Sequence, residues 1–177
     1  MTEAPIISTE RLRLRPHVLS DMDAFREFFR SDRARYVDGP SDETHLWYGF
    51  ASEVGSWSLC NWGGWAIETP DGALVGQVAI TKPPHFAEVE LGWILFDGFE
   101  GRGYAEEAAR AALDWAFEVR GLPTLVSYIH RDNARSVALA KRLGAYHDAA
   151  ASAHDPDDVV YRHPHPNEVQ GGVEAYA

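Results

Sequence analysis

The sequence predicts a mixed α/β (α+β) fold, with a mostly antiparallel central sheet, one parallel strand pair and about four flanking helices. Three observations predict it. Two strand-like segments, 64–68 and 73–81, are joined by a strong turn signal and indicate an antiparallel hairpin. Segment 88–120 has the order strand, glycine-rich loop, helix, and a further strand follows at 125–129. A helix between two such strands implies a parallel pair with a right-handed crossover.

Length and composition bound the class of protein. A chain of 177 residues is expected to form one domain with an ample core. The net charge of −11 leaves no basic stripe for nucleic acid. The single cysteine, Cys60, excludes an intrachain disulfide and favours a reducing compartment. Because no apolar run approaches the ~18 residues of a membrane span and no signal peptide is evident, we expect a cytoplasmic protein without a membrane partner.

The N-terminal quarter predicts a strand followed by two helices. Residues 1–7 read as a loose leader, and 9–16 alternate with Leu12 and Leu14 on one face, which predicts a half-buried strand ending at Pro16. Capped by Ser20 or Asp21, a helix is expected to run to about Arg30, and a loop covers 32–40. Its apolar side carries Met22, Phe25, Phe28 and Phe29.

The second helix is predicted to begin at Ser41 or Asp42. Its inward positions recur at helical spacing and are Leu46, Phe50, Val54 and Trp57. Trp57, Trp62 and Trp65 lie close together, either as an aromatic wall for a substrate or, for at least two of them, as core. This tryptophan-rich helix is also where a homodimer could form.

A central strand is predicted from near Phe86 to Phe96, and Gly92 within it suggests a bulge or a close backbone approach. The loop that follows contains Gly98, Gly101 and Gly103, so successive backbone N–H groups can converge on one concave face. An alanine-rich helix then runs to Arg120, with its positive dipole end at the same place. This geometry predicts a pyrophosphate site, with Arg102 adding positive charge; the alternative is a plain surface turn.

The rest of the chain completes the strand–helix pattern. A helix capped by Asp132 or Asn133 ends at Gly144, and a final strand is expected at 159–162. The loop is neither the nucleotide-hydrolase motif nor the dinucleotide fingerprint, because Gly-Lys-Ser/Thr and Gly-x-Gly-x-x-Gly do not occur in it. No metal is expected from His154, His163 and His165, whose spacing is a poor ligand pattern.

The run Glu100-Gly101-Arg102-Gly103-Tyr104-Ala105 resembles the acyl-CoA-binding loop of the GCN5-related N-acetyltransferase superfamily, Gln/Arg-x-x-Gly-x-Gly/Ala. Glu100 departs from that pattern. The continuation to Ala108 and the opening Thr9-Glu10-Arg11-Leu12 resemble the ribosomal-protein N-terminal acetyltransferase-like subgroup. The resemblance covers residues 8–166 as one domain and leaves 167–177 as a C-terminal tail.

The resemblance implies the acyl-CoA N-acyltransferase fold, with its parallel strands splayed apart, and acetyl-CoA as cosubstrate. It implies that the backbone of the central strand pairs with the cofactor and that a second element, Asn-x-x-Ser, contacts it from the other side. The implied cofactor-binding residues are Ile94, Leu95, Phe96, Gly101, Arg102, Gly103, Tyr104, Ala105, Asn133 and Ser136. Ala145 stands where the family usually has phenylalanine.

The reaction implied is transfer of an acetyl group from acetyl-CoA to a primary amine, on a small molecule or a protein N-terminus, by direct attack in a ternary complex. Glu90 stands where one branch keeps its general base, with Glu88 as second choice; the alternative is a structural carboxylate paired with an arginine. The oxyanion donor would be a backbone N–H near Leu95 or Phe96.

Ala140 occupies the position of the tyrosine acid that many members use, and the resemblance to the ribosomal-protein subgroup implies Ser136 as the acid instead. The alternatives are Tyr104 or Tyr128 as the acid, with Ser136 only hydrogen-bonding the cofactor. A non-catalytic acyl-CoA-binding sensor of the same fold is the alternative function.

Overall fold

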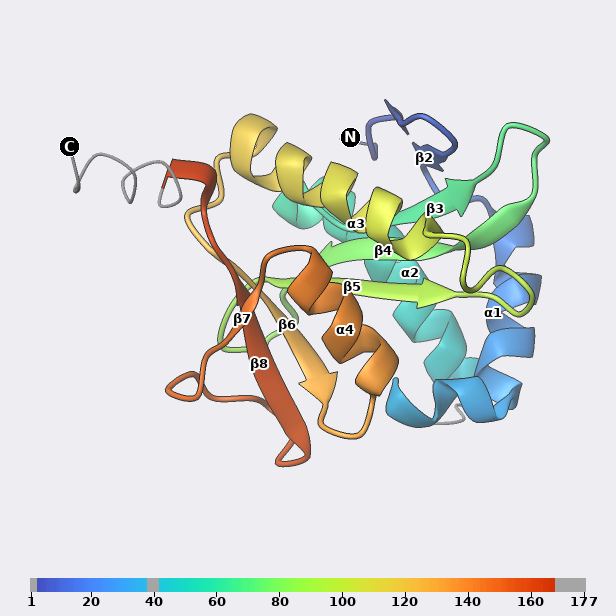
Figure 1. The fold of residues 1–177 in the computed structure, drawn as a ribbon. Coiled ribbons are helices and arrows are strands. Elements are labelled where there is room, and N and C mark those ends of the chain that lie inside the picture. The colour runs from blue at the N-terminus through green and yellow to red at the C-terminus, as the bar shows by residue number, and fades with distance from the viewer. Residues whose placement is uncertain (1–2, 38–41, 168–177) are drawn as a thin grey trace.

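The computed structural model describes residues 3–37 and 42–167 and contains one mixed sheet with helices on both faces (Figure 1). Its strands are β1 (Ile7–Ser8), β2 (Arg13–Arg15), β3 (Gly64–Glu68), β4 (Leu74–Thr81), β5 (Glu90–Leu95), β6 (Leu125–His130), β7 (Tyr146–His147) and β8 (Asp158–His163). The strand order is β1-β2-β3-β4-β5-β6-β8-β7. Within the described residues only β5 and β6 pair in parallel, which confirms the predicted fold class.

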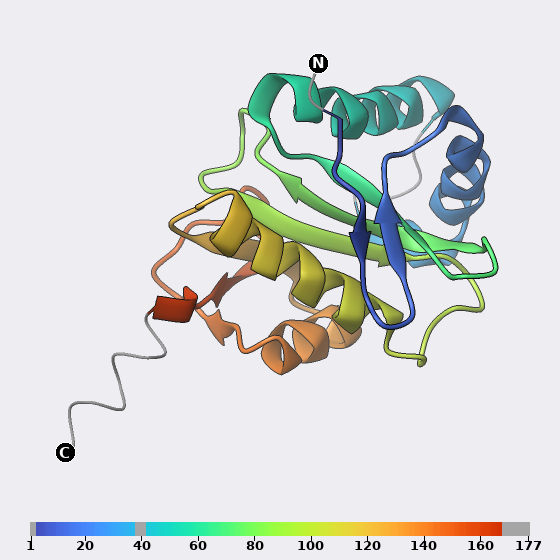
Figure 2. The same cartoon turned by 90° about the horizontal axis from the view of Figure 1, so that it is seen from above.

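The helices form two layers, one on each face of the sheet (Figure 2). They are η1 (Leu19–Asp21), α1 (Met22–Arg30), η2 (Asp32–Tyr36), α2 (Glu43–Cys60), α3 (Tyr104–Asp114), its π-helical continuation η3 (Trp115–Val119) and α4 (Ala134–Arg142). Helices α1 and α2 cover one face, while α3 and α4 cover the other. None of the helices in the described ranges is long and apolar enough to cross a membrane.

The N-terminal segment differs from the single strand predicted over 9–16. The chain makes a tight turn in which the Thr9 N–H donates to the Leu12 carbonyl at 2.9 Å, and β1 pairs antiparallel with β2. Leu12 and Leu14 are buried as predicted. Part of the expected loose leader is packed instead, since Ala4 is buried and the Pro5 carbonyl accepts from Trp65 Nε1 at 2.8 Å, while Ile6 is 56% exposed.

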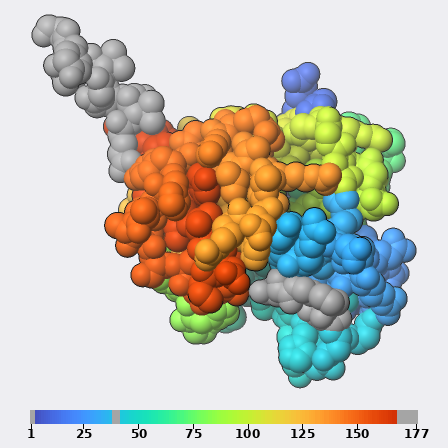
Figure 3. Space-filling view, turned by 60° about the horizontal axis from the view of Figure 1, so that its bottom comes forward, coloured from blue at the N-terminus to red at the C-terminus, as the bar shows by residue number. Residues whose placement is uncertain are grey.

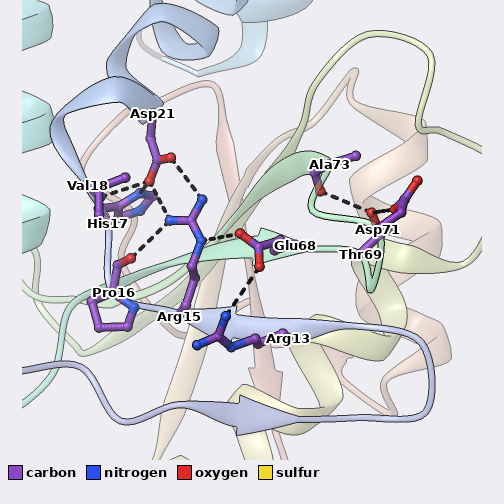
Figure 4. Close-up of polar contacts among 10 residues, drawn as sticks. All are labelled: Arg13, Arg15, Pro16, His17, Val18, Asp21, Glu68, Thr69, Asp71 and Ala73. Carbon is purple, nitrogen blue, oxygen red and sulfur yellow. Dashed lines mark hydrogen bonds and ion pairs between the residues drawn. The ribbon is translucent and has the colours of Figure 1, made fainter.

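The arginines of this segment are held by carboxylates (Figure 4). Arg15 donates to Asp21 at 2.8 and 3.0 Å and to Glu68 at 2.5 Å, while Arg13 reaches Glu68 at 3.5 Å. Asp21 was a candidate cap for α1, but its carboxylate binds Arg15 and the Val18 N–H instead. Burial would raise the pKa of Asp21, but hydrogen bonds from His17, Arg15 and Val18 outweigh burial and keep that pKa well below its usual range.

Helix α2 begins as predicted, with the Asp42 carboxylate accepting the N–H groups of Thr44 and His45 at 2.9 Å. Its inward side is different from the prediction at one position. Val54 faces outward and is 42% exposed, and Glu53 takes the inward place between Phe50 and Trp57. At the far end of the helix, the rings of Trp57 and Trp65 are 4.6 Å apart in the core, which confirms core packing for two of the three tryptophans.

The β3–β4 hairpin follows the prediction, including the turn over residues 69–72. The central strand is shorter than predicted, because β5 begins at Glu90 and Phe86 lies in the preceding loop. Gly92 pairs with Ala79 in regular register, so the predicted bulge is absent there. The close approach occurs at Gly76 instead, where a Cβ would overlap the Ile94 carbonyl oxygen.

The predicted loop over 32–40, the final strand and the C-terminal tail compare with the structure as follows. The segment expected as a loop over 32–40 contains the short helix η2, and residues 38–40 lie outside the described residues. The final strand is present as β8, one residue longer at each end than predicted. Of the predicted tail, residues 168–177 lie outside the described part.

Candidate active site

The parallel strands β5 and β6 separate immediately after they meet. Glu90 and Val126 form their one paired position, and the Val126 N–H donates to the Val89 carbonyl at 3.1 Å. One residue on, the Ser127 hydroxyl donates to the Leu91 carbonyl at 2.6 Å in place of a backbone bond. Figure 1 shows the two strands diverging towards their carboxyl ends. The divergence leaves an opening in the middle of the sheet, at the end where ligands bind in open α/β sheets.

Backbone groups of β5 alternate between β4 and this opening. The Phe96 N–H donates to the Val75 carbonyl at 2.9 Å, so alternation turns Ile94 towards β4 as well and turns Trp93 and Leu95 towards the opening. The Phe96 N–H is therefore bonded to β4, while alternation directs the Leu95 N–H at the opening. The cofactor contacts expected at Ile94, Leu95 and Phe96 remain a prediction.

The loop after β5 has the conformation that the glycines predicted. Gly98, Gly101 and Gly103 have φ values of +82°, +72° and +80°. Gly103 precedes α3 without any side-chain cap, and the Glu107 N–H donates back to its carbonyl at 3.0 Å. The N–H groups of the first turn, at Tyr104 and Ala105, therefore have no intrahelical acceptor and point out of the helix end. Backbone N–H groups and the helix dipole at this point fit a pyrophosphate.

Arg11 holds this loop from the N-terminal hairpin. Its guanidinium donates to the Arg102 carbonyl at 2.9 Å and to the Glu107 carboxylate at 2.8 Å, and it lies over the Tyr104 ring at 5.3 Å. The Arg102 side chain is exposed, with its guanidinium 5.9 Å from the centre of the Phe99 ring. Arg102 is thus free of internal ion pairs among the described residues and accessible to an anion at the loop.

Helix η2 crosses the opening from the other layer. Arg33 donates to the Leu95 carbonyl at 2.8 Å and forms an ion pair with Glu100. Tyr36 packs its ring 5.0 Å from that of His130 at the end of β6, and Figure 3 shows these two parts of the chain side by side. Glu100, which departs from the family pattern, therefore has an ion-pair partner in Arg33. Sequence reasoning missed η2 because a five-residue helix carries no periodic signal.

The two candidate bases have different surroundings. Glu88 receives both guanidinium nitrogens of Arg162, at 2.7 and 2.8 Å, and this hydrogen bonding lowers the pKa of Glu88 although burial opposes it. Glu88 is thus a structural carboxylate paired with an arginine. This pairing argues against Glu88 as the second choice of general base. Glu90 is half-buried at the point where the strands part, and its Oε1 accepts the Tyr128 N–H at 3.4 Å.

On the β6 side, Asn133 caps α4 by accepting the Ser136 N–H at 3.2 Å. Ser136 lies in the first turn of that helix and is half-buried. Both α3 and α4 begin after the carboxyl ends of the splayed strands, so their N-termini flank the same opening (Figure 1). Of the alternative acids, Tyr128 accepts the Glu88 N–H at 3.1 Å through its hydroxyl, and burial raises its pKa.

The histidines considered as metal ligands have different surroundings. His163 is buried, and its Nε2 lies 2.9 Å from the Ser127 hydroxyl, while His154 stacks on Phe86 with ring centres 4.2 Å apart. Within residues 3–37 and 42–167, no group of three or more His, Cys, Asp or Glu residues could hold a metal ion.

A splayed parallel pair with an uncapped glycine loop and two flanking helix N-termini defines the acyl-CoA N-acyltransferase class. Comparison with known proteins agrees: the family described as acetyltransferase (GNAT) domain matches residues 11–146. The chain therefore belongs to the GNAT acetyltransferase family.

Three known proteins show the range of similarity. A crystal structure of an acetyltransferase from Agrobacterium tumefaciens is 44% identical, with a TM-score of 0.89 over 93% of this chain and 96% of that one. The uncharacterized N-acetyltransferase YnaD of Bacillus subtilis is 30% identical over 73 residues, which span 40% of this chain and 42% of YnaD. A RimL ribosomal L7/L12 alpha-N-protein acetyltransferase, solved with coenzyme A, has a TM-score of 0.71 at 18% identity, covers 89% of this chain and 97% of that one, and shares the fold.

Proposed function

We propose that this protein transfers the acetyl group of acetyl-CoA to a primary amine, on a small molecule or a protein N-terminus, by direct attack in a ternary complex. The single observation that carries this proposal is the opening between β5 and β6, flanked by the uncapped start of α3. Membership of the GNAT family supports acetyl transfer, and the backbone cradle supports a pyrophosphate-bearing cosubstrate.

Binding would be divided between the two flanking elements. The N–H groups from Gly101 to Ala105 and the exposed Arg102 side chain would hold the pyrophosphate, and Asn133 and Ser136 would contact the cosubstrate from α4. The Leu95 N–H, directed into the opening, would donate to the oxyanion that forms when the amine adds to the thioester carbonyl. Acetyl-CoA supplies that carbonyl and, after C–S cleavage, a thiolate leaving group.

Proton transfers would use Glu90 and Ser136. The attacking amine must be neutral, and Glu90 lies on the sheet face opposite α3, where it can take the proton directly or through a water. An N-terminal α-amine, with a pKa of about 8, needs less help than a lysine at about 10.4. Ser136, at the start of α4, would return a proton to the thiolate.

A second candidate function is acyl-CoA sensing without turnover, and Ala140 favours it. This residue is fully buried in α4 at the position where many members of the family carry a tyrosine acid. Glu90 and Ser136 together favour the enzyme.

Calorimetric titration with acetyl-CoA, CoA and ATP, followed by thiol release with a panel of amines, separates these functions. Acetyl transfer predicts micromolar binding of acetyl-CoA with thiol release on at least one amine. Thiol release should be reduced in Glu90→Gln without loss of acetyl-CoA binding, and in Ser136→Ala it should be reduced by more than any weakening of acetyl-CoA binding explains. Binding with no release on any amine, including peptide N-termini, supports sensing, while ATP binding tighter than either CoA species contradicts both.

A further inference from the structure

The N-terminal run Thr9-Glu10-Arg11-Leu12 has no part in the proposed function, yet it lies directly against the cofactor loop. The contact is centred on Glu107, in the first turn of α3, whose carboxylate accepts the Thr9 hydroxyl at 2.5 Å and the Arg11 N–H at 2.8 Å. The same carboxylate accepts Arg11 Nε at 2.8 Å and forms an ion pair with Arg11 Nη2 at 2.7 Å. Two residues of the N-terminal hairpin thus supply four donors to one side chain of α3.

These contacts keep Glu107 charged and hold Arg11 in place. Burial would raise the pKa of Glu107, but hydrogen bonds from Thr9 and from the backbone and side chain of Arg11 outweigh burial and lower that pKa. Hydrogen bonds between a guanidinium and a carboxylate are strong and directional. The Arg11 guanidinium is therefore fixed by Glu107, although the Arg11 side chain is 47% exposed.

The fixed guanidinium contacts three consecutive residues of the loop. Its Nη1 donates to the Arg102 carbonyl at 2.9 Å. Its Nη2 lies 3.2 Å from the place that a Cβ on Gly103 would take, and its Cζ is 5.3 Å from the centre of the Tyr104 ring. Arg11 therefore connects the N-terminal hairpin to the peptide between Arg102 and Gly103.

The loop sequence does not decide how the peptide between Arg102 and Gly103 is oriented. Turning this peptide plane over changes φ of Gly103, and glycine adopts positive and negative φ about equally well. The observed φ is +80°. In a trans peptide the C=O and N–H point in opposite directions, so a carbonyl held by Arg11 directs the Gly103 N–H to the other side of the loop. With the plane turned over, a carbonyl oxygen would replace that N–H.

We propose that Arg11 is a positioning residue of the cosubstrate site, which selects the orientation of the 102–103 peptide that offers an N–H to the pyrophosphate. Thr9 and Glu107 hold Arg11 for this role. The inference rests on the proposed function, because it takes the pyrophosphate of acetyl-CoA as the anion bound at the loop. A donor that is already oriented binds more tightly, since no binding free energy is lost in ordering the loop. Arg11 acts through this peptide and does not itself bind the pyrophosphate.

Calorimetric binding of CoA and of S-acetylpantetheine, which has the thioester arm without the pyrophosphate, tests this role without acetyl transfer. In Arg11→Met we expect CoA to bind about tenfold more weakly than in the wild type, and S-acetylpantetheine to bind equally well. Arg13→Met is the matched control, because Arg13 lies in the same hairpin, is 49% exposed and contacts Glu68 instead of the loop. This control should leave both affinities unchanged.

A double variant separates positioning from the charge of Arg11. Arg11→Met leaves the Glu107 carboxylate without its counter-charge, and that carboxylate could repel the pyrophosphate. Combining Arg11→Met with Glu107→Gln removes one positive and one negative charge, so the net charge beside the loop stays the same. Positioning predicts that CoA binding remains about tenfold weaker in the double variant.

The order of the peptide can be measured without any ligand by ¹⁵N relaxation of the Gly103 amide. In the wild type and in Arg13→Met the amide should be rigid, with an order parameter of about 0.85. In Arg11→Met the order parameter should fall to about 0.6 or below. A Gly103 amide that stays equally rigid in Arg11→Met would overturn the inference.

Three binding results would overturn it as well. They are unchanged CoA affinity in Arg11→Met, equal weakening of CoA and S-acetylpantetheine, and return of wild-type CoA affinity in the double variant. Thiol release on an amine by the wild type, with CoA affinity independent of Arg11, would refute this inference alone. Arg11-dependent CoA binding with no thiol release on any amine would refute acetyl transfer alone.

Discussion

Replacing Glu53 by glutamine should stabilise the protein, and by an amount that depends on pH. The carboxyl has a pKa of about 7 in the folded chain, against its ordinary value of 4.5, because burial penalises its charged form. Between these two values the folded state binds more protons than the unfolded state, so the contribution of Glu53 to stability falls as pH rises. Above pH 7 the full pKa difference of about 2.5 lowers the free energy of unfolding by about 3 kcal/mol.

Glutamine is nearly isosteric with the protonated acid and does not titrate. The free energy of unfolding of Glu53→Gln should therefore exceed that of the wild type by about 2.5 kcal/mol more at pH 8 than at pH 5. Urea unfolding followed by tryptophan fluorescence measures this, because the chain has six tryptophans, three of which form the cluster of Trp57, Trp65 and Trp115. For a domain of this size the gain at pH 8 amounts to roughly 5–10 °C in melting temperature.

A matched variant separates burial from the mere loss of a negative charge. Glu27→Gln removes one charge from the exposed side of α1 and should change stability by no more than about 0.5 kcal/mol at either pH. If Glu53→Gln shows the same small change at pH 5 and pH 8, Glu53 is ionised and compensated in the native state. The reasoning from burial would then be refuted, and with it the interpretation of Glu53 as an unsatisfied acceptor.

Four further outcomes follow from the site and the sheet. Glu90→Gln should lower kcat by about 10²-fold or more with the acetyl-CoA dissociation constant unchanged, and equal rates in thiol-release assays would remove Glu90 as base. Gly103→Ala should weaken acetyl-CoA binding in calorimetry about tenfold, because φ is +80° and the new Cβ would lie 3.2 Å from Arg11 Nη2; unchanged affinity would contradict the cradle. Burial lowers the pKa of His163 from 6.5 to about 4, so between these two pH values the unfolded state binds more protons than the folded state. The free energy of unfolding should therefore fall by about 3 kcal/mol as pH drops from 6.5 to 4. Urea unfolding curves of His163→Gln should lack this loss. Arg33→Ala should leave Glu100 unpaired and change the acetyl-CoA dissociation constant, measured by calorimetry, several-fold, whereas Arg30→Ala should not.

Local sequence signals were sufficient for most of the fold. The β3–β4 hairpin, the loop glycines and the Asp42 cap each depend on a backbone conformation that few residue types allow, so the residue type alone predicts the geometry. The register of β5 was beyond such signals, since the backbone direction of Leu95 and Phe96 is decided by which residue faces Val75 on β4. The same applies to the N-terminal hairpin, where alternation over 9–16 is compatible with one strand or with two short ones.

One error of prediction, at Val54 and Glu53, lies on the α2 face of the sheet, and its cause is physical. On the α3 side the proposed ligand would be held by backbone N–H groups, whose placement by Gly101 and Gly103 is visible in the sequence. On the α2 side, periodicity favoured Val54 as the inward residue because burying an apolar side chain costs less free energy, yet the structure turns its neighbour Glu53 inward and buries its Oε2. A position where the chain retains an unsatisfied carboxyl against its own hydrophobic pattern requires a compensating gain, which a bound donor would supply. The failure of the periodic pattern at Glu53 is thus itself an argument that the carboxyl is retained for a reason other than the packing of α2 on the sheet.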